Sequence, residues 1–123
     1  MDTKRIEAVR AGLPLTELDR VAEMLGVDGS RLAPILGISL RTLQGKAECD
    51  GRLGPVASDR LTRIERIHEL ATHVLGERVK ASRWLTTVSR ALGGETPLEL
   101  LDTDPGAQRV QEELHEIEYG ISL

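Results

Sequence analysis

Apolar residues recur along most of this chain at the three- and four-residue spacing of an amphipathic α-helix, and no stretch alternates as a half-buried strand does. We therefore expect an all-α protein. The pattern predicts helices over residues 3–11, 16–25, 29–36, 39–48, 56–75, 77–92, 97–101 and 105–119. The longest would be a central helix between a helix-turn-helix-like N-terminal subdomain and a small helical C-terminal subdomain. Glycines and a proline interrupt the pattern before residue 56, so we expect regions 1–54 and 55–123.

Several of the expected helices carry start signals. Thr16 and Ser39 are hydroxyl residues placed to accept a hydrogen bond from the first turn of a helix. The stretch Thr96-Pro97-Leu98-Glu99 has the spacing of a capping box with proline at the first helical position. Asp104-Pro105 predicts the start of the last helix in the same way.

Residues 32–43 have the properties of a helix-turn-helix. Ala33 is small where two helices must approach closely, Gly37 gives the turn its backbone freedom four residues later, and Ser39 caps the second helix. Apolar residues on either side of the turn would fill the wedge between the two helices. This arrangement places the second helix where it can enter a DNA groove.

The exposed side of that second helix is a candidate for reading DNA. Arg41 and Gln44 can make bidentate contacts to guanine and adenine edges, and Lys46 suits a phosphate. The predicted DNA-binding residues are Ser39, Arg41, Thr42, Gln44 and Lys46. The alternative is a helical hairpin that reads no DNA. Pro34 and Gly45 weaken the two helices, so we expect DNA binding to be weak or to need a dimer.

Composition indicates which residues form the core and what kind of surface the long helix presents. Aromatic residues make up 2% of the chain, so the core must be aliphatic. The lone tryptophan, Trp84, is expected in that core beneath the turn at Pro97. Arginines recur every third residue of the long helix, at Arg60, Arg63 and Arg66. We interpret them as a solvated face paired with neighbouring carboxylates, with a phosphate-contacting edge as the alternative.

Other features exclude whole classes of protein. No apolar run approaches the ~18 residues of a membrane span, and the N-terminus has no stretch of signal-peptide type. Cys49 is the single cysteine and cannot form an internal disulfide, so we expect the cytoplasm. The histidines lack metal-site spacing, and no nucleophile–base pair or phosphate loop is present. We therefore expect no enzyme activity, no catalytic residue, no metal and no cofactor.

The charge of the chain is unevenly placed. The net charge is −4, and the acidic excess lies in the second region, mostly between residues 102 and 118. Glutamates gather on the last helix, opposite its apolar face, at Glu112, Glu113, Glu116 and Glu118. Such a face is complementary to a basic partner. Two halves with different electrostatics suggest two different partners.

The second half of the chain resembles a known family almost from end to end. The residues that carry the likeness are Ala81, Trp84-Leu85, Ala91-Leu92-Gly93-Gly94, Thr96-Pro97-Leu98-Glu99-Leu100-Leu101, Thr103, Gly106, Val110, Leu114, Ile117-Glu118 and Gly120. They resemble the toxin-binding domain of the Xre/MbcA/ParS antitoxins. Upstream, the stretch 36–43 and Arg60-Leu61 resemble the same family's Xre-like N-terminal half.

The resemblance implies a function and a set of partners. It implies an antitoxin of a type II toxin–antitoxin system that neutralises a RES-domain toxin, an enzyme that consumes NAD or ADP-ribosylates a target. Neutralisation would block the toxin's NAD pocket, and a homodimer within a hetero-oligomeric complex would repress its own operon at operator DNA. The alternative function is a stand-alone helix-turn-helix transcriptional regulator.

The toxin-facing surface is expected at the end of the chain. An acidic face followed by an extended tail with a terminal carboxylate could compete for a pocket built for an anionic dinucleotide. The expected toxin-binding residues are Glu112, Glu113, Glu116, Glu118, Tyr119, Gly120, Ile121, Ser122 and Leu123.

Overall fold

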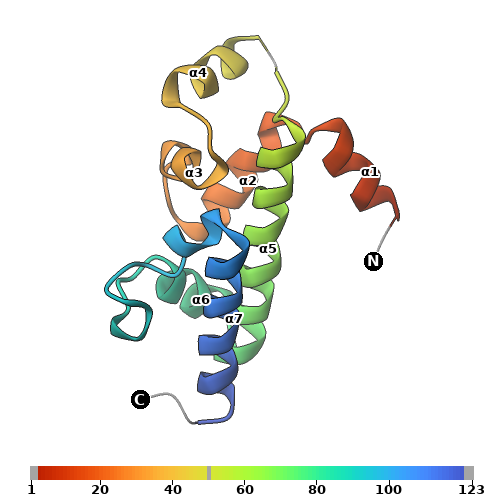
Figure 1. Ribbon diagram of the computed structural model, residues 1–123. Coiled ribbons are helices and arrows are strands. Elements are labelled where there is room, and N and C mark those ends of the chain that lie inside the picture. The colour runs from red at the N-terminus through yellow and green to blue at the C-terminus, as the bar shows by residue number, and fades with distance from the viewer. Residues whose placement is uncertain (1–2, 50, 121–123) are drawn as a thin grey trace. The chain divides into compact units, whose positions relative to one another are not determined.

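The computed structural model describes residues 3–49 and 51–120, which are mostly helical (Figure 1). The elements are α1 (Thr3–Ala11), α2 (Leu15–Leu25), α3 (Gly29–Leu36), α4 (Leu40–Glu48), α5 (Pro55–Leu75), α6 (Arg78–Leu85), the short 3-10 helices η1 (Arg90–Leu92) and η2 (Glu99–Asp102), and α7 (Asp104–Glu118). Within these described ranges, β-type pairing is limited to isolated bridges at Pro14–Arg52 and Ser89–Glu95. The expected all-α fold is confirmed.

The chain divides into two compact units, Met1–Thr62 and Arg63–Leu123. The division falls inside α5, whereas the sequence suggested a boundary at 54/55. The physical reason is that the start of α5 is bonded to the N-terminal helices. Ser58 accepts a hydrogen bond from the Leu13 amide, and Arg60 donates one to the Ile35 carbonyl. Residues 55–62 therefore belong to the first unit.

The first unit is built on the buried faces of α2 and α3. These faces consist of Leu18, Val21, Ala22 and Leu25 in α2 and of Leu32, Ala33, Ile35 and Leu36 in α3. They follow the helical spacing that the sequence predicts. Each fully buried leucine contributes about 1.5–3 kcal/mol relative to exposure. Packing of α2 and α3 therefore stabilises this unit, together with the buried Leu53 and Leu61.

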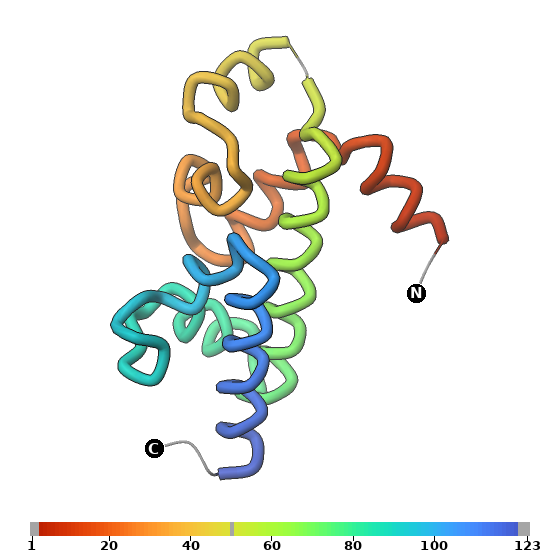
Figure 2. The backbone as a smooth tube through the Cα atoms, viewed as in Figure 1, coloured from red at the N-terminus to blue at the C-terminus, as the bar shows by residue number. Residues whose placement is uncertain are grey.

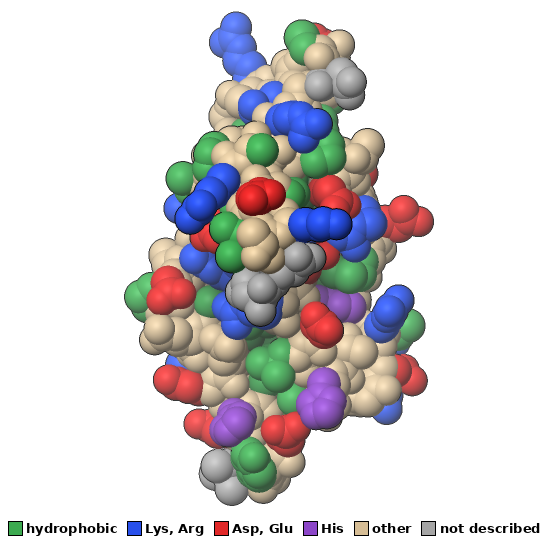
Figure 3. Space-filling model, turned by 90° about the vertical axis from the view of Figure 1, so that its right-hand side faces the viewer, with side chains coloured by type: hydrophobic (Ala, Val, Ile, Leu, Met, Phe, Trp, Pro, Cys, Tyr) green, Lys and Arg blue, Asp and Glu red, His purple; other side chains and the backbone are tan. Residues whose placement is uncertain are grey.

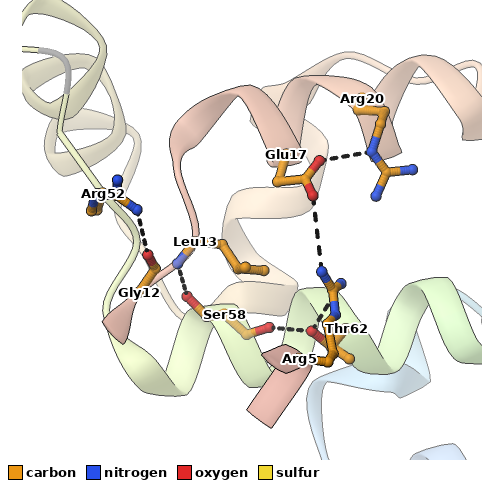
Figure 4. A network of polar contacts seen from close by, with 8 residues as sticks. All are labelled: Arg5, Gly12, Leu13, Glu17, Arg20, Arg52, Ser58 and Thr62. Carbon is orange, nitrogen blue, oxygen red and sulfur yellow. Dashed lines mark hydrogen bonds and ion pairs between the residues drawn. The ribbon is translucent and has the colours of Figure 1, made fainter. Parts of the chain in front are cut away.

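The turn between α1 and α2 is fastened to the loop that enters α5 (Figure 4). The Leu53 amide donates to the Leu13 carbonyl at 2.9 Å, and the Leu13 amide donates to Ser58 Oγ at 2.8 Å. Arg52 Nη1 donates to the Gly12 carbonyl at 3.0 Å. Gly12 has φ +96°, and a Cβ there would lie 2.3 Å from the Leu53 carbonyl oxygen. Only glycine fits this crossing.

Polar contacts hold α1, whose residues Thr3–Ala11 include none that is buried. Arg5 donates to Thr62 Oγ1 at 3.3 Å and lies 3.9 Å from the carboxylate of Glu17 (Figure 4). Glu17 also accepts a hydrogen bond from Arg20 at 2.7 Å. The first helix is thus attached through ion pairs and hydrogen bonds rather than through a shared apolar core.

The second unit has an aliphatic core, as its composition predicts. Its buried apolar residues are Ile64, Ile67, Ala71, Ala81, Leu85, Leu92, Leu98, Leu101, Ala107, Val110 and Leu114. Trp84, which was expected in this core, is half-buried rather than fully buried. The buried face of α6 passes through Ala81 and Leu85, four residues apart, and position 84 lies at the edge of that face.

The segment between α6 and α7 is a succession of turns, visible as the cyan part of the tube in Figure 2. A helix was expected to continue to residue 92, but α6 ends at Leu85. The hydroxyls of Thr86 and Thr87 donate to the carbonyls of Ser82 and Arg83, at 2.8 Å and 2.5 Å. These bonds satisfy the last carbonyls of α6, so the backbone can leave the helix. The two β-branched residues favour that exit.

The expected helix starts are confirmed in part. Ser39 Oγ accepts from the Thr42 amide at 3.1 Å, and Thr96 Oγ1 accepts from the Glu99 amide at 3.2 Å. The last helix is capped by Thr103 rather than by Asp104. Thr16 is no cap, because α2 begins one residue earlier, at Leu15.

Among the described helices, none has both the length and the apolar character that crossing a membrane requires.

Candidate functional sites

Helix α4, the second helix of the predicted helix-turn-helix, lies on the surface over its whole length. None of its residues Leu40–Glu48 is buried, and Leu40 is 54% exposed. Arg41 and Gln44 are both exposed, as the sequence predicts for residues that read DNA. A long donor side chain on such a surface can reach a base edge without moving the backbone. We call Arg41 and Gln44 the reading residues from here on.

The turn before α4 is held from below by α5. Gly37 adopts φ +76°, and the Ile38 amide donates to the Ala33 carbonyl at 2.9 Å, which closes the end of α3. Arg60 Nη1 donates to the Ile35 carbonyl at 3.3 Å. A Cβ at Gly37 would lie 2.8 Å from the same Nη1 atom. The guanidinium therefore packs directly against the turn.

The far end of α4 is tied to the loop that follows it. Lys46 Nζ donates to the Arg52 carbonyl at 2.6 Å, and the Gly51 amide donates to the Lys46 carbonyl at 2.7 Å. The Arg52 guanidinium in turn bonds the Gly12 carbonyl. Sequence reasoning gave Lys46 a phosphate-contacting role, and the structure gives its ammonium group a partner within the protein.

An open groove lies between this turn, α4 and the start of α5. Its volume is about 520 Å³, and its lining includes Ile38, Thr42, Lys46, Val56 and Arg60. The groove combines aliphatic side chains with two cationic groups. It borders α4 at Thr42 and Lys46, within the first unit.

Helix α7 carries the expected toxin-facing glutamates, and the structure separates them. Glu112 is exposed and Glu116 is half-buried. The placement of Glu113 on the outer face is wrong, since it is 4% exposed. Its carboxylate lies 3.5 Å from Arg109 Nη2, which also donates to the Ala91 carbonyl at 3.0 Å. Glu113 thus holds the arginine that fastens η1 to α7.

The end of α7 presents an aromatic residue. Tyr119 is 66% exposed, and its ring meets that of His115 edge-on at 4.9 Å between centroids. Glu118 lies 3.6 Å from His73, at the end of α5, so the two helices run side by side here (Figure 1). Gly120 is exposed. Ile121, Ser122 and Leu123 lie outside the described residues.

The arginines of α5 do not form the solvated, carboxylate-paired face that was expected. Arg60 donates to the Ile35 carbonyl, and Arg63 Nη1 donates to the Leu101 carbonyl at 2.9 Å. Both carbonyls belong to the last turn of a short helix, where backbone acceptors have no partner within the helix. Arg66 is exposed. On the face shown in Figure 3, cationic and anionic side chains are interspersed.

His68 is buried in the second unit, as expected of a structural histidine. It is 4% exposed, and its Nε2 lies 2.9 Å from Ser82 Oγ of α6. Burial, and next the positive charge of Arg78, lower the pKa of His68 from its ordinary value of 6.5. The neutral imidazole is therefore the form that links α5 to α6.

No three metal-ligating side chains come together within residues 3–49 and 51–120, and Cys49 is exposed. Sequence reasoning missed the structural roles of Arg60, Arg52 and Arg109, each of which bonds a backbone carbonyl. Such partners leave no signal in a sequence, because every residue has a carbonyl.

Both halves of the chain match described families. Residues 4–66 match the antitoxin Xre-like helix-turn-helix domain, and residues 70–120 match the antitoxin Xre/MbcA/ParS C-terminal toxin-binding domain. The helix-turn-helix assignment made from residues 32–43 is thereby confirmed. The matched C-terminal segment contains α6, η1, η2 and α7.

Three curated relatives share the name Antitoxin Xre. A protein named Antitoxin Xre from Yersinia enterocolitica is 27% identical over 120 residues, covering 97% of this chain and 81% of that protein. An Antitoxin Xre from Pseudomonas putida is 41% identical over 86 residues, covering 70% of this chain and 54% of that protein. An Antitoxin Xre from Photorhabdus laumondii is 31% identical over 111 residues, covering 89% and 75%. With two family domains that together span most of its length, this chain belongs to the Xre antitoxin family.

Proposed function

We propose that this protein is the antitoxin of a type II toxin–antitoxin system and neutralises a RES-domain toxin by blocking the toxin's NAD pocket. The observation that carries the proposal is the match of residues 70–120 to a toxin-binding domain. It is supported by the exposed acidic side of α7, which ends in the exposed Tyr119. A pocket that binds a dinucleotide must offer basic groups to its phosphates, and carboxylates complement such groups.

The toxin-facing surface is reduced by one residue from the sequence-based set. Glu112, Glu116 and Glu118 remain as its acidic members, together with residues 119–123 of the sequence-based set. Glu113 is removed, because its carboxylate is buried against Arg109. The surface acts by binding, and the protein contributes no catalytic group of its own.

Deletion of residues 119–123 tests this surface. The deletion removes no residue of the α7 core, so the fold of the second unit is expected to survive. NAD consumption by the toxin encoded beside this gene should return in a mixture of the two purified proteins, even where the proteins still associate. Equal inhibition by the truncated and full-length chains would place the block elsewhere, on the helical face or on residues 93–101.

We further propose that α4 binds operator DNA and that a homodimer, within the toxin–antitoxin complex, represses its own operon. The match of residues 4–66 to a helix-turn-helix domain and the exposure of the reading residues support this. One arginine–guanine contact is worth ~1–3 kcal/mol. Arg41→Ala should therefore weaken operator binding by about tenfold or more and leave toxin inhibition unchanged. Unchanged operator affinity would contradict the assignment of α4.

A stand-alone transcriptional regulator is the competing function, favoured by the helix-turn-helix match alone. Such a protein has no need of a toxin-binding segment. Co-purification with the product of the neighbouring reading frame separates the two functions. A stable complex that lacks NAD-consuming activity supports the antitoxin, and the absence of any complex supports the regulator.

A further inference from the structure

The reading helix α4 lacks the usual means by which a helix is held in place. Surface helices of globular proteins are fixed by burying an apolar stripe, yet none of the residues Leu40–Glu48 is buried. A binding site needs its side chains within about 0.5 Å and 10–20° of the productive geometry. Of the apolar side chains of α4 only Leu43 is half-buried, so polar contacts must help to set the orientation from which Arg41 and Gln44 project.

At its N-terminal end, α4 is held through the turn that precedes it. Arg60 bonds the Ile35 carbonyl, and its guanidinium fills the space beneath Gly37, where a Cβ would come within 2.8 Å. Ser39 then caps α4 by accepting from the Thr42 amide. A displacement of the guanidinium would release the end of α3 and the turn together.

At its C-terminal end, α4 is held by a chain of three polar groups. The Lys46 ammonium bonds the Arg52 carbonyl, and the Arg52 guanidinium bonds the Gly12 carbonyl. Gly12 is itself fixed, because its α-carbon packs against the Leu53 carbonyl and no side chain fits there. These bonds therefore attach the C-terminal end of α4 to the point where Gly12 packs against the Leu53 carbonyl, within the same unit.

We propose that Arg60 and Lys46 are positioning residues that hold the two ends of the reading helix, and that Lys46 does so in place of a phosphate contact. The proposal rests on the DNA binding proposed above for α4. Under this proposal, the ability to distinguish one DNA sequence from another depends on the hydrogen bonds made by Arg60 and Lys46. We call these two contacts the clamps; neither touches a base. Both donors are charged, and a charged donor to a carbonyl is roughly twice as strong as a neutral one.

A positioning residue and a phosphate contact leave different signatures. Loss of one phosphate contact lowers affinity for every DNA sequence alike and reduces the slope of log K against log salt by about 0.9. Loss of a positioning residue lowers affinity for the operator, leaves binding to unrelated DNA nearly unchanged and leaves that residual slope unchanged. Loss of a positioning residue can also be detected without DNA, because a helix that is no longer held in place exchanges its amide hydrogens faster.

The test compares Lys46→Met and Arg60→Met with Arg66→Met in the full-length protein. Arg66→Met removes the same single charge from an exposed position on α5. Binding is measured by fluorescence anisotropy, at several salt concentrations, on the DNA upstream of the gene and on a scrambled duplex of equal composition. Hydrogen exchange is measured on the free proteins, at the α4 amides and at the α7 amides.

Both clamp variants should weaken binding to the upstream DNA by about tenfold, the loss expected for one hydrogen bond from a charged donor. Binding to the scrambled duplex should change less than about twofold. The α4 amides, including that of Leu43, should exchange faster, with α7 unchanged; Arg66→Met should show neither effect. Arg60→Lys, which keeps a cationic donor, should restore part of the affinity.

Two results overturn the proposal. Equal losses on both duplexes, with a shallower salt dependence for Lys46→Met, would make Lys46 a phosphate contact. Unchanged α4 exchange in both variants would show that the clamps do not hold the helix. Wild-type protein that fails to distinguish the two duplexes would contradict the proposed DNA function, and the exchange measurement would still decide whether the clamps fix α4.

Discussion

The helices α4 and α7 carry the two proposed binding surfaces and are fixed in opposite ways. α7 buries Ala107, Val110, Glu113 and Leu114 in the core of the second unit. α4 buries none of its residues and is held by polar bonds at its ends. Apolar burial is non-directional, whereas a hydrogen bond weakens steeply with misalignment. The toxin-facing surface should therefore be lost together with the fold of its unit, while the DNA-facing surface can be lost from a folded protein.

The largest expected effect comes from shortening a leucine of each helix. Leu114 of α7 is fully buried, so Leu114→Ala should lower the free energy of unfolding of the second unit by about 2–5 kcal/mol. Leu40 of α4 is 54% exposed, and Leu40→Ala should change stability by less than about 0.5 kcal/mol. Denaturant titration, followed by the fluorescence of Trp84 in the second unit, measures the first change, and circular dichroism measures the second.

The contrast between the helices fails if the two substitutions have similar effects. A loss of more than about 2 kcal/mol for Leu40→Ala would show that α4 packs against apolar surface after all. Toxin inhibition gives an independent reading. Leu114→Ala should abolish it through unfolding, and Leu40→Ala should leave it intact.

A smaller effect is expected from two adjacent glutamates of α7. Glu113 is buried beside Arg109, so Glu113→Gln should cost about 1–3 kcal/mol of stability through loss of the buried ion pair. Glu112 is exposed, and Glu112→Gln should leave stability unchanged but slow association with a basic partner at low salt. Thermal unfolding and stopped-flow binding to the toxin measure the two quantities.

Comparing Glu112 with Glu113 is informative because the two residues are identical in type and adjacent in sequence but differ in burial. If Glu112→Gln destabilises the unit as much as Glu113→Gln, the burial of Glu113 makes no specific contribution to the free energy of unfolding. If Glu113→Gln slows association while stability is retained, Glu113 belongs to the toxin-facing surface, as the sequence suggested.

Glu113 also shows what could and could not be predicted from the sequence. Helical periodicity was enough to predict α2, α3 and the buried leucines of the second unit, because apolar spacing has a direct cause in burial. The same spacing places Glu113 three residues from Val110, at the border of the apolar face. Its side is decided by Arg109, whose second partner is a backbone carbonyl at Ala91, eighteen positions away.

The clamps of α4 were beyond the sequence for a related reason. Lys46 is a cation on a predicted reading helix, and that residue type in that position indicates a phosphate. The structure shows its ammonium group bonded to the Arg52 carbonyl, beyond the end of its own helix. Local patterns predict which residues are exposed but not which distant backbone groups they meet. The outcome for Arg60 and Arg63 has the same origin.

The smallest expected effect is a pH dependence confined to the second unit. Burial and the charge of Arg78 hold the pKa of His68 below its ordinary value of 6.5, so the unfolded chain binds a proton more readily than the folded one. His68 therefore contributes stability that is present above about pH 6.5 and is lost as the pH falls through its folded pKa. The free energy of unfolding, followed by Trp84 fluorescence, should decrease from pH 7.5 to about pH 5.5.

Two histidine variants test whether this pH dependence arises from His68. Ser82 and Arg78 face its imidazole from α6, and both remain in His68→Gln, which keeps a polar group near Ser82 but cannot gain a proton. The slope should become flatter in this variant, and it should persist in His73→Gln, which leaves His68, Ser82 and Arg78 in place. A slope that survives His68→Gln would have to come from another titrating group. In α4, which contains no histidine, amide exchange corrected for the intrinsic effect of pH should not change over this range.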